Sequence, residues 1–410
     1  MSDIPPTPGS DHRRPLDGIR VLDWAEGVAG PYSCQLMADL GADVVKVERP
    51  QGDWGRDSGP GDGGHHFRAY NRNKRNLCLD LAHPGGREVA YRLIENADAM
   101  VTAFRPGVTE RLGIGYEHGI ERNPSLVYVR ISAYGYDGPL SPRPGSDTIL
   151  QAVSGLMSQI GEPDGDPQRV GVPVIDILAA RDAVIGVLGR LLTRSQGPPP
   201  PVDVSLFASA ASFQAQLWQT YFDIGTVQQR AGHRHPSLAP GGLYRTQDGR
   251  HITVAVLRDE HFAKVCTALD LGDLAVDPRF ATNALRLENR QELEGIIVPA
   301  FASRPFDELV PRLLDHDILA GPVMQIPDIE ADPAMVAALP IVEVLDPHGA
   351  PAGRSLGSPM GIGSAVGPEP AAARRGAHTR AVLSDVGYSE AEIEELVASG
   401  VTPDDGDSES

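Results

Sequence analysis

The feature that most constrains the fold is an alternation of short apolar runs with helical patterns in the N-terminal half of the chain. Residues 19–24 predict a buried strand, residues 31–40 a helix and residues 43–48 a second strand, which together make one βαβ unit. The alternation continues with helices at 86–96 and 177–192 and strands at 99–102, 125–132 and 202–206. Because a parallel pair of strands needs a crossover connection, the pattern predicts an α/β fold, with helices on both faces of a parallel sheet.

The length of the chain favours more than one domain. A sequence of 410 residues exceeds what one compact core holds. Pro198 to Pro201 fit a rigid connector, because proline is excluded from helix interiors and central strands. Beyond them a hairpin is predicted at 243–256, with Asp248-Gly249 as its turn. The proline-rich residues 1–15 and the acidic residues 401–410 are expected to be disordered.

Charge and composition argue against several classes of partner and place the chain in a reducing compartment. The formal net charge is −19, whereas nucleic acids and anionic membranes select basic protein surfaces. No apolar run approaches the ~18 residues of a membrane span, and the first ten residues lack the apolar core of a signal peptide. Cys34, Cys78 and Cys266 are scattered and odd in number, which is typical of reduced thiols in a cytoplasm. No metal site is expected, because histidine and cysteine show no ligand spacing.

The loop of the first βαβ unit carries part of a dinucleotide-binding pattern. Gly27 and Gly30 follow the predicted strand, and Glu48 lies about twenty residues further on. The third glycine is absent, however, and Pro31 removes a backbone N–H from the first helical turn, where a pyrophosphate needs donors. A tight strand-to-helix turn is therefore the better interpretation.

Asp176 stands where a long apolar helical pattern begins, in the segment Gly171-Val-Pro-Val-Ile-Asp176. Aspartate is a preferred N-cap residue, and the positive end of the helix dipole keeps its carboxylate ionised. An ionised carboxylate at this place is also a usable nucleophile. Taken by itself, the segment favours a helix cap without chemistry.

A series of short motifs runs in a fixed order through residues 15–400. The motifs cover residues 15–23, 41–50, 71–75 with 79–81, 104–107, 112–116, 138–139, 143–145, 154–157, 171–176, 202–206, 277–280 and 321–323. In this order they resemble the CoA-transferases of family III, the CaiB/BaiF type that includes the formyl-CoA and carnitine CoA-transferases. The resemblance implies an enzyme that takes an acyl-CoA and a carboxylic acid as its substrates.

The resemblance implies a role for particular residues. Asp176 is the nucleophile, which passes through an acyl-aspartyl anhydride and an aspartyl-CoA thioester. Gly241 and Gly242 form a substrate loop that supplies backbone N–H groups or shields the anhydride, unless they are an ordinary turn entering the hairpin. Arg49 and Arg111 suit phosphate clamping. The residues implied to bind CoA are Val28, Ala29, Arg49, Leu79, Asp80, Leu81, Ala82, Phe104, Arg111 and Arg143. The basic run Asn71-Arg-Asn-Lys-Arg75 either attracts phosphate or forms a solvated turn.

Departures from the family pattern leave two alternatives open. Val28 stands where the formyl-CoA enzyme has a glutamine, and Ala82 and Ala103 replace frequent polar residues, which puts formate and oxalate specificity in doubt. These losses allow a CoA-binding protein without turnover. The α-methylacyl-CoA racemases share the fold and use a histidine with the aspartate to move a proton, but here Ser146 stands in place of that histidine. His233 and His235 are expected in an exposed loop.

The resemblance also implies a domain arrangement and an assembly. Residues 16–224 and a return segment at 331–400 form a large Rossmann-like domain built from both chain ends. Residues 225–330 form a smaller α+β domain. Family members of this kind are interlocked homodimers.

Overall fold

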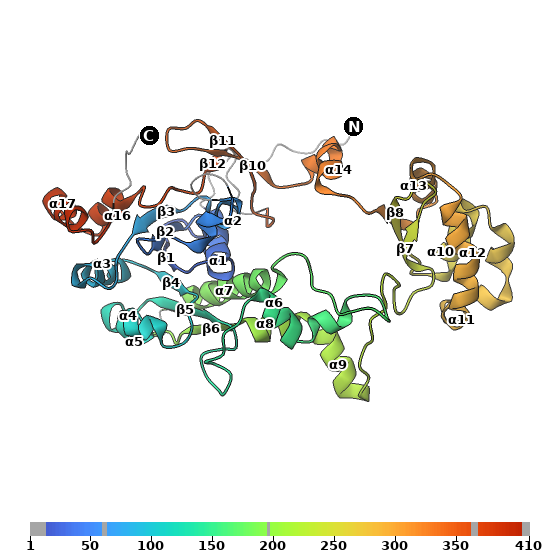
Figure 1. The fold of residues 1–410 in the computed structure, drawn as a ribbon, viewed down its shortest axis with the longest axis horizontal. Coiled ribbons are helices and arrows are strands. Elements are labelled where there is room, and N and C mark those ends of the chain that lie inside the picture. Colours follow the sequence, from blue (N-terminus) through green and yellow to red (C-terminus); the bar gives the residue numbers. More distant parts are fainter. Residues whose placement is uncertain (1–13, 60–63, 195–196, 362–367, 404–410) are drawn as a thin grey trace. The chain divides into compact units, whose positions relative to one another are not determined.

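The computed structural model describes residues 14–59, 64–194, 197–361 and 368–403 of the chain (Figure 1). These residues fall into two compact units. The first comprises the chain up to residue 154, residues 170–224 and the chain from residue 338 onward, and the second comprises residues 155–169 and 225–337. Most of the termini that are expected to be disordered, residues 1–13 and 404–410, lie outside the described residues.

A parallel sheet forms the centre of the first unit. Among the described residues its order is β3-β2-β1-β4-β5-β6, and every neighbouring pair is parallel. The strands are β1 (Arg20–Trp24), β2 (Asp43–Glu48), β3 (Arg75–Cys78), β4 (Ala99–Thr102), β5 (Val127–Ser132) and β6 (Val202–Ser205). The predicted α/β fold with a parallel sheet is therefore confirmed. The strand order reverses between β1 and β4, and open sheets of this kind bind ligands outside the carboxyl ends of the strands at such a point.

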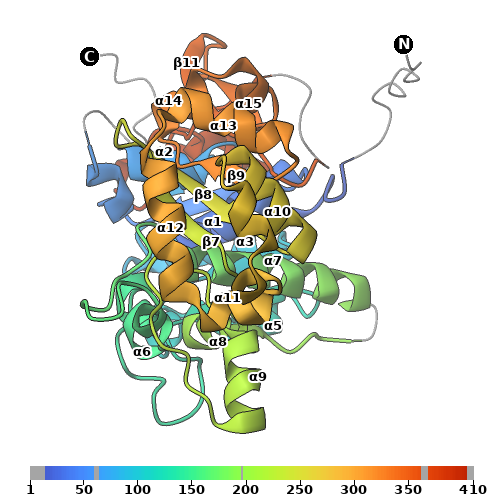
Figure 2. The same ribbon diagram turned by 90° about the vertical axis from the view of Figure 1, so that its right-hand side faces the viewer.

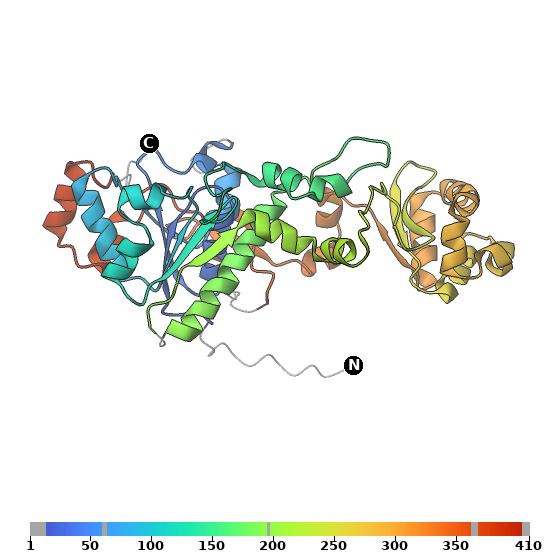
Figure 3. The same cartoon turned by 90° about the horizontal axis from the view of Figure 1, so that it is seen from below.

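Helices cover both faces of this sheet, as Figure 3 shows for α7 on one side and α3 and α17 on the other. One layer is made by α1 (Ala29–Asp39), α7 (Val174–Thr193) and α8 (Leu206–Phe213), which contact one another or the strands. The other layer contains α3 (Pro84–Glu95), α5 (Tyr116–Arg122), α16 (Thr379–Asp385) and α17 (Glu390–Ala398). Side chains of Leu22, Val89, Leu383 and Ile393 share one buried core, so both ends of the chain belong to the same apolar cluster.

Asn71, Arg72 and Lys74 of the basic run at 71–75 are buried, and Asn73 and Arg75 are partly buried, so the interpretation as a solvated turn is wrong. The ion pairs of Arg72 and Lys74 also leave these two cations occupied. Lys74 Nζ donates to Asp23 Oδ2 at 2.7 Å, and Arg72 Nη2 donates to Asp39 Oδ2 at 2.6 Å. Arg72 also pairs with Glu369 of the return segment. Three nearby carboxylates thus neutralise the two cations, as a buried charge requires.

The second unit has its own sheet and core (Figure 2). The hairpin of β7 (Gly241–Arg245) and β8 (His251–Ala255) is antiparallel and confirms the prediction at 243–256, and β9 (Leu319–Pro322) extends it in the order β7-β8-β9. Ile252, Val254, Phe301 and Leu309 belong to its buried cluster. Its helices are α10 (Asp259–Ala268), α11 (Asn283–Glu288), α12 (Arg290–Ala302), α13 (Phe306–Asp315), α14 (Ile326–Glu330) and α15 (Pro333–Ala337).

The first unit contains a second sheet and four further helices among its described residues. A separate sheet of the return segment has the order β11-β10-β12. Its strands are β10 (Ile341–Leu345), β11 (Pro351–Leu356) and β12 (Glu369–Pro370), and the other helices are α2 (His65–Asn71), α4 (Val108–Leu112), α6 (Asp147–Val153) and α9 (Ala215–Ile224).

Candidate active site

Asp176 lies in the first turn of α7, but it does not cap the helix, so this part of the prediction is wrong. The N-cap residue is Pro173, which offers no side-chain acceptor. The acceptor is instead Asp147, the first residue of α6, whose Oδ2 receives the amide N–H groups of Ile175 at 2.7 Å and Asp176 at 3.3 Å. Gln151 Nε2 donates to Asp147 Oδ1 at 2.6 Å and fixes the carboxylate. The start of α7 is therefore capped by a side chain from another helix.

The Asp176 carboxylate accepts no hydrogen bond from any residue that the structure describes. Burial and the negative charge of Asp147 raise its pKa to about 7. The helix dipole, which favours an ionised carboxylate, is outweighed by these two effects. The surroundings of Asp176 therefore oppose the expectation that the helix dipole keeps it ionised, because burial and Asp147 favour its protonated form.

A cavity of about 190 Å³ opens in front of Asp176. It lies where β1, β4 and β5 end, because the loops that follow these strands supply most of its walls. This is the point at which the strand order reverses. The lining residues are Glu26, Gly27, Val28, Ala29, Trp54, Ala103, Phe104, Arg105, Pro106, Ile131, Ser132, Ala133, Ser141, Arg143, Gly145, Ser146, Asp176 and Leu206.

The structure brings part of the expected CoA-binding set to this cavity. Val28, Ala29, Phe104 and Arg143 line it together with Asp176. Arg49 does not line the cavity itself, but its Nε lies 3.3 Å from the carboxylate of Glu26, which does.

The other expected positions do not line the cavity. Asp80, Leu81, Ala82 and Arg111 are absent from its wall, and the Leu79 side chain is buried in the core of the first unit. Any contact of Leu79 with a ligand would therefore come from its backbone. Gly241 and Gly242 belong to the second unit, where they line a separate cavity of about 330 Å³ together with His233 and Glu294.

Trp54 is a cavity residue that the sequence pattern does not single out. Its indole lies against Gly27, where a Cβ atom would come within 2.9 Å of the ring, so the positive φ and the lack of a side chain at Gly27 are both needed. The ring also packs on His66, with centroids 4.9 Å apart. A tryptophan in a glycine-rich, polar segment is the one signal that could have pointed to it.

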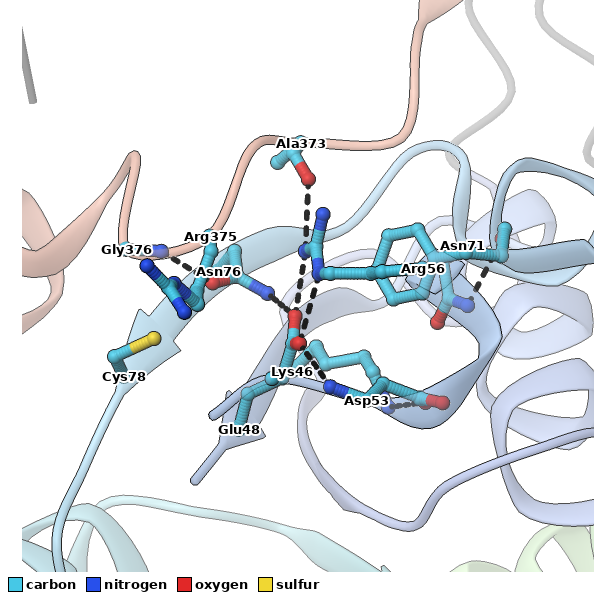
Figure 4. Close-up of polar contacts among 12 residues, drawn as sticks. Lys46, Glu48, Asp53, Arg56, Asn71, Asn76, Cys78, Ala373, Arg375 and Gly376 are labelled. Carbon is cyan, nitrogen blue, oxygen red and sulfur yellow. Dashed lines mark hydrogen bonds and ion pairs between the residues drawn. The ribbon is translucent and has the colours of Figure 1, made fainter. Parts of the chain in front are cut away.

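A buried ionic network holds the loop that carries Trp54 (Figure 4). Asp53 Oδ1 accepts the N–H groups of Gly55 at 2.8 Å and Gly27 at 3.4 Å, and its Oδ2 lies 3.0 Å from Lys46 Nζ. The amide of Asp53 in turn donates to Glu48 Oε2 at 2.7 Å. Glu48 therefore helps to hold the Trp54 loop of the cavity wall, and its own oxygens are occupied by the Asp53 amide and Arg56.

The described residues hold no group of three or more histidine, cysteine or acidic side chains that could bind a metal ion. Within the same residues, every helix is too short or too polar to cross a membrane. Cys34, Cys78 and Cys266 are all buried, and the described residues form no disulfide bond.

Comparison with known proteins gives consistent matches over most of the chain. The family model for CoA-transferase family III matches residues 16–379. The mouse succinyl-CoA:glutarate CoA-transferase is 32% identical over 408 residues, which is 97% of this chain and 92% of the relative. The succinyl-CoA--D-citramalate CoA-transferase of Chloroflexus aurantiacus is 33% identical and covers 82% of this chain and 84% of its own length.

Solved structures agree with these matches. A CaiB/BaiF family protein from Brucella suis superimposes with a TM-score of 0.82 at 32% identity, covering 92% of this chain and all of the Brucella chain. A protein from Mycobacterium tuberculosis in an orthorhombic crystal form gives a TM-score of 0.78 at 30% identity, covering 90% of this chain and 99% of its own.

Proposed function

The chain belongs to CoA-transferase family III, and we propose that it moves coenzyme A from an acyl-CoA thioester to a carboxylic acid with Asp176 as the covalent nucleophile. One observation carries the assignment of the nucleophile. Asp176 is a carboxylate without a hydrogen-bond partner among the described residues, and it lines a cavity at the carboxyl ends of the sheet strands. A carboxylate of this kind is free to attack a bound thioester.

The proposed reaction is a sequence of four balanced acyl transfers. The Asp176 carboxylate attacks the thioester carbonyl, so that a C–O bond forms, the C–S bond breaks and CoA leaves as a thiolate. The thiolate then attacks the aspartyl carbonyl of the mixed anhydride, which gives an aspartyl-CoA thioester and releases the first carboxylate. The acceptor carboxylate attacks this thioester, and the CoA thiolate finally attacks the acceptor's acyl carbon, which restores Asp176. No proton and no electron is gained or lost overall.

The pKa of Asp176 fits this role at neutral and alkaline pH. A carboxylate with a raised pKa is a stronger nucleophile than an ordinary one, provided that it is ionised. Raising the pH through about 7 removes its proton. The rate of the first acyl transfer in the free enzyme should therefore rise through this range.

We infer that CoA lies along the cavity wall formed by Val28, Ala29 and Phe104, with Arg143 contacting an anionic group of the ligand. The Arg143 guanidinium makes no hydrogen bond to the rest of the described chain, so it is available to a ligand. Arg49 and Arg111 are proposed to contact phosphates from outside the cavity wall.

Arg143→Gln is expected to weaken CoA binding roughly 10- to 100-fold, because a hydrogen bond to a charged group contributes about 1.5–3 kcal/mol. Isothermal titration calorimetry with free CoA measures the change. Arg122→Gln removes a guanidinium from an exposed pair with Glu95 and should leave the affinity unchanged. If Arg143→Gln and Arg122→Gln bind CoA with equal affinity, CoA does not contact Arg143 and lies elsewhere.

The racemase alternative is weakened by the cavity wall. Ser146 lines it where a racemase would have its histidine, and none of the described lining residues is a histidine. His233 lines the separate cavity of the second unit, and His233 and His235 are both exposed. A serine hydroxyl does not titrate near neutral pH and so cannot act as a general acid and base as an imidazole does.

Trapping separates the transferase, the racemase and a CoA-binding protein without turnover. Succinyl-CoA is the first donor to test, because it stands in the names of the mouse and Chloroflexus relatives. After incubation with it and then hydroxylamine, mass spectrometry should find a modification on the peptide that contains Asp176. Incubation of a 2-methylacyl-CoA in deuterated water should give no label at the α-carbon. Rapid α-deuteration without an adduct would favour the racemase. The absence of both the adduct and the label would favour a CoA-binding protein without turnover.

We also infer a homodimer, a Rossmann-like larger domain and a cytoplasmic location. The exposed apolar face of α9 supports the dimer: none of its residues is buried, and Phe222 and Ile224 are 69% and 73% exposed. A sedimentation mass equal to the 43.7 kDa of one chain would contradict it.

A further inference from the structure

The amide groups at the start of α7 are occupied by a carboxylate that does not belong to α7. The side chain of the N-cap residue normally accepts such amide groups, but here that residue is Pro173, which has no side-chain acceptor. Here Asp147 of α6 accepts the N–H groups of both Ile175 and Asp176, and Gln151 holds it in that position. Asp147 is buried, so this arrangement is not a fluctuating surface contact.

This arrangement changes the chemistry of Asp176. Hydrogen bonds from amide groups stabilise the ionised form of a carboxylate, withdraw electron density from its oxygens and lower its nucleophilicity. With the amides occupied by Asp147, the Asp176 oxygens keep their lone pairs free on the side of the cavity. The carboxylate of Asp147 also adds a negative charge close to them.

We propose that Asp147 is a positioning residue for CoA transfer, which keeps Asp176 unbonded by occupying the amide groups of α7 and which disfavours its charged state by repulsion. The proposal rests on the function proposed above, in which Asp176 is the nucleophile. It gives Asp147 no contact with the reacting atoms.

The repulsion between the Asp147 and Asp176 carboxylates acts only in those states of the reaction in which Asp176 is charged. Asp176 is negatively charged before the attack, and it is neutral in both the anhydride and the CoA thioester. Acylation therefore removes the like-charge interaction with Asp147. Asp147 consequently favours the covalent intermediates over the free carboxylate, which assists the first attack and opposes only the last step, in which the carboxylate is restored.

The other ionisable groups around this pair are few. Tyr70 of α2 lies close enough that, after burial, the charges of Asp176 and Asp147 raise its pKa, and its ring packs against Tyr32 of α1 at 5.5 Å between centroids. Glu26, Arg105 and Arg143 face the cavity. Only burial and Asp147 shift the pKa of Asp176, which supports Asp147 as the charged group that controls it.

The test is the pH dependence of kcat/KM for the purified full-length enzyme with succinyl-CoA and an acceptor acid. The wild type should show an acid limb near pH 7. Asp147→Asn keeps an oxygen acceptor for the amides but removes the charge, so the limb should move down by at least about one pH unit. The kcat on the alkaline plateau should fall by up to about 10-fold for each pH unit that the limb moves, because a less basic carboxylate is a weaker nucleophile. The KM for the acyl-CoA should stay nearly unchanged.

Asp147→Ala should have the larger effect. It leaves the amides of Ile175 and Asp176 without an acceptor, and their dipoles then favour the charged form of Asp176, so the acid limb should lie lower than in Asp147→Asn. If this variant does not fold, Asp147→Ser, whose hydroxyl offers an uncharged acceptor, should place the limb near that of Asp147→Asn. Asp203→Asn is the matched control: Asp203 of β6 pairs with Arg130 of β5 and does not line the cavity, so its loss should leave the limb near pH 7.

The outcomes separate this proposal from the proposed function. An acid limb that stays near pH 7 in Asp147→Asn, with only the thermal stability reduced, would show that Asp147 is merely structural and would overturn the proposal. Full activity of an Asp176→Asn variant would overturn the nucleophile itself, and with it the premise. An inactive Asp176→Asn together with an unmoved limb in Asp147→Asn would sink this proposal alone.

Discussion

Asp176→Asn and Asp176→Ala should lower kcat/KM for CoA transfer at least about 10⁴-fold, the scale of loss when a covalent nucleophile is removed. Neither side chain can form an anhydride with the acyl group. The loss should appear in kcat rather than in the affinity for CoA, because the cavity wall that holds the ligand is unchanged. Rapid quench with labelled succinyl-CoA measures the first acyl transfer directly.

The same variants should not weaken the fold. The pKa of Asp176 is raised from 3.8 to about 7 in the folded chain, so the native state holds the proton more tightly than the unfolded state does. The cost of its ionisation is absent below about pH 4, grows as the pH rises and is complete above about pH 7. At pH 8 the variants should therefore match the wild type or exceed it by roughly 1–4 kcal/mol. Urea denaturation at pH 5 and pH 8 measures the difference.

Asp182→Asn is the control on the same helix. Asp182 accepts a hydrogen bond from Ser209 Oγ at 2.5 Å and does not line the cavity, so its replacement should leave the rate nearly unchanged. Wild-type turnover by Asp176→Ala would contradict the nucleophile assignment, and a large loss of stability at pH 8 would contradict the account of the local charges.

The parallel sheet could be predicted because its signal is local. The apolar runs that became β1, β2, β4 and β5 are short, uninterrupted and separated by helical patterns. The short helices α4, α6 and α9 lack that signal, since five to ten residues give too few turns for a period to be counted. Their positions depend on contacts with other elements.

The proposed nucleophile could be singled out from the sequence, whereas the charges around it could not. Asp176 is marked by the start of a long helix, whereas its cap and charged neighbour, Asp147, comes from a separate helix 29 residues earlier. The basic run at 71–75 shows the same limit. Its partners Asp23 and Glu369 lie 51 residues from Lys74 and 297 residues from Arg72, so no local pattern indicates that these cations are neutralised and buried.

Glu48 is expected to be the most costly carboxylate to remove from the interior. It is 3% exposed, and its two oxygens accept Arg56 Nε at 2.9 Å, Arg56 Nη2 at 2.6 Å and the amide of Asp53 at 2.7 Å. Asn76 donates to it as well, and Arg56 continues to the carbonyl of Ala373 in the return segment. Figure 4 shows this group between β2, β3 and the return segment.

Glu48→Ala should destabilise the protein by about 3–5 kcal/mol, because it breaks the buried ion pair with Arg56 and removes the buried acceptor of the Asp53 amide and of Asn76. Burial raises the pKa of Glu48, but the hydrogen bonds of Arg56 and the charges of Lys46 and Arg56 outweigh it and lower the pKa to about 2. The contribution of Glu48 is therefore complete above about pH 4.5 and is lost as the pH falls toward 2. The difference in unfolding free energy between the wild type and Glu48→Ala should shrink over that range.

Glu48→Ala should change the binding of the acyl-CoA as well as the stability of the fold. Glu48 holds the amide of Asp53, and Asp53 holds Gly27 and the loop of Trp54, so Glu48→Ala loosens two walls of the cavity that contains Asp176. Under conditions where the variant is still folded, KM for the acyl-CoA should rise while the acid limb stays near pH 7, since Asp147 and Asp176 are untouched. Glu95→Gln, which breaks only an exposed pair with Arg122, should change stability by less than about 1 kcal/mol and leave both kinetic constants alone. Equal stability of Glu48→Ala and Glu95→Gln in urea would show that the buried network does not fasten the return segment to the sheet.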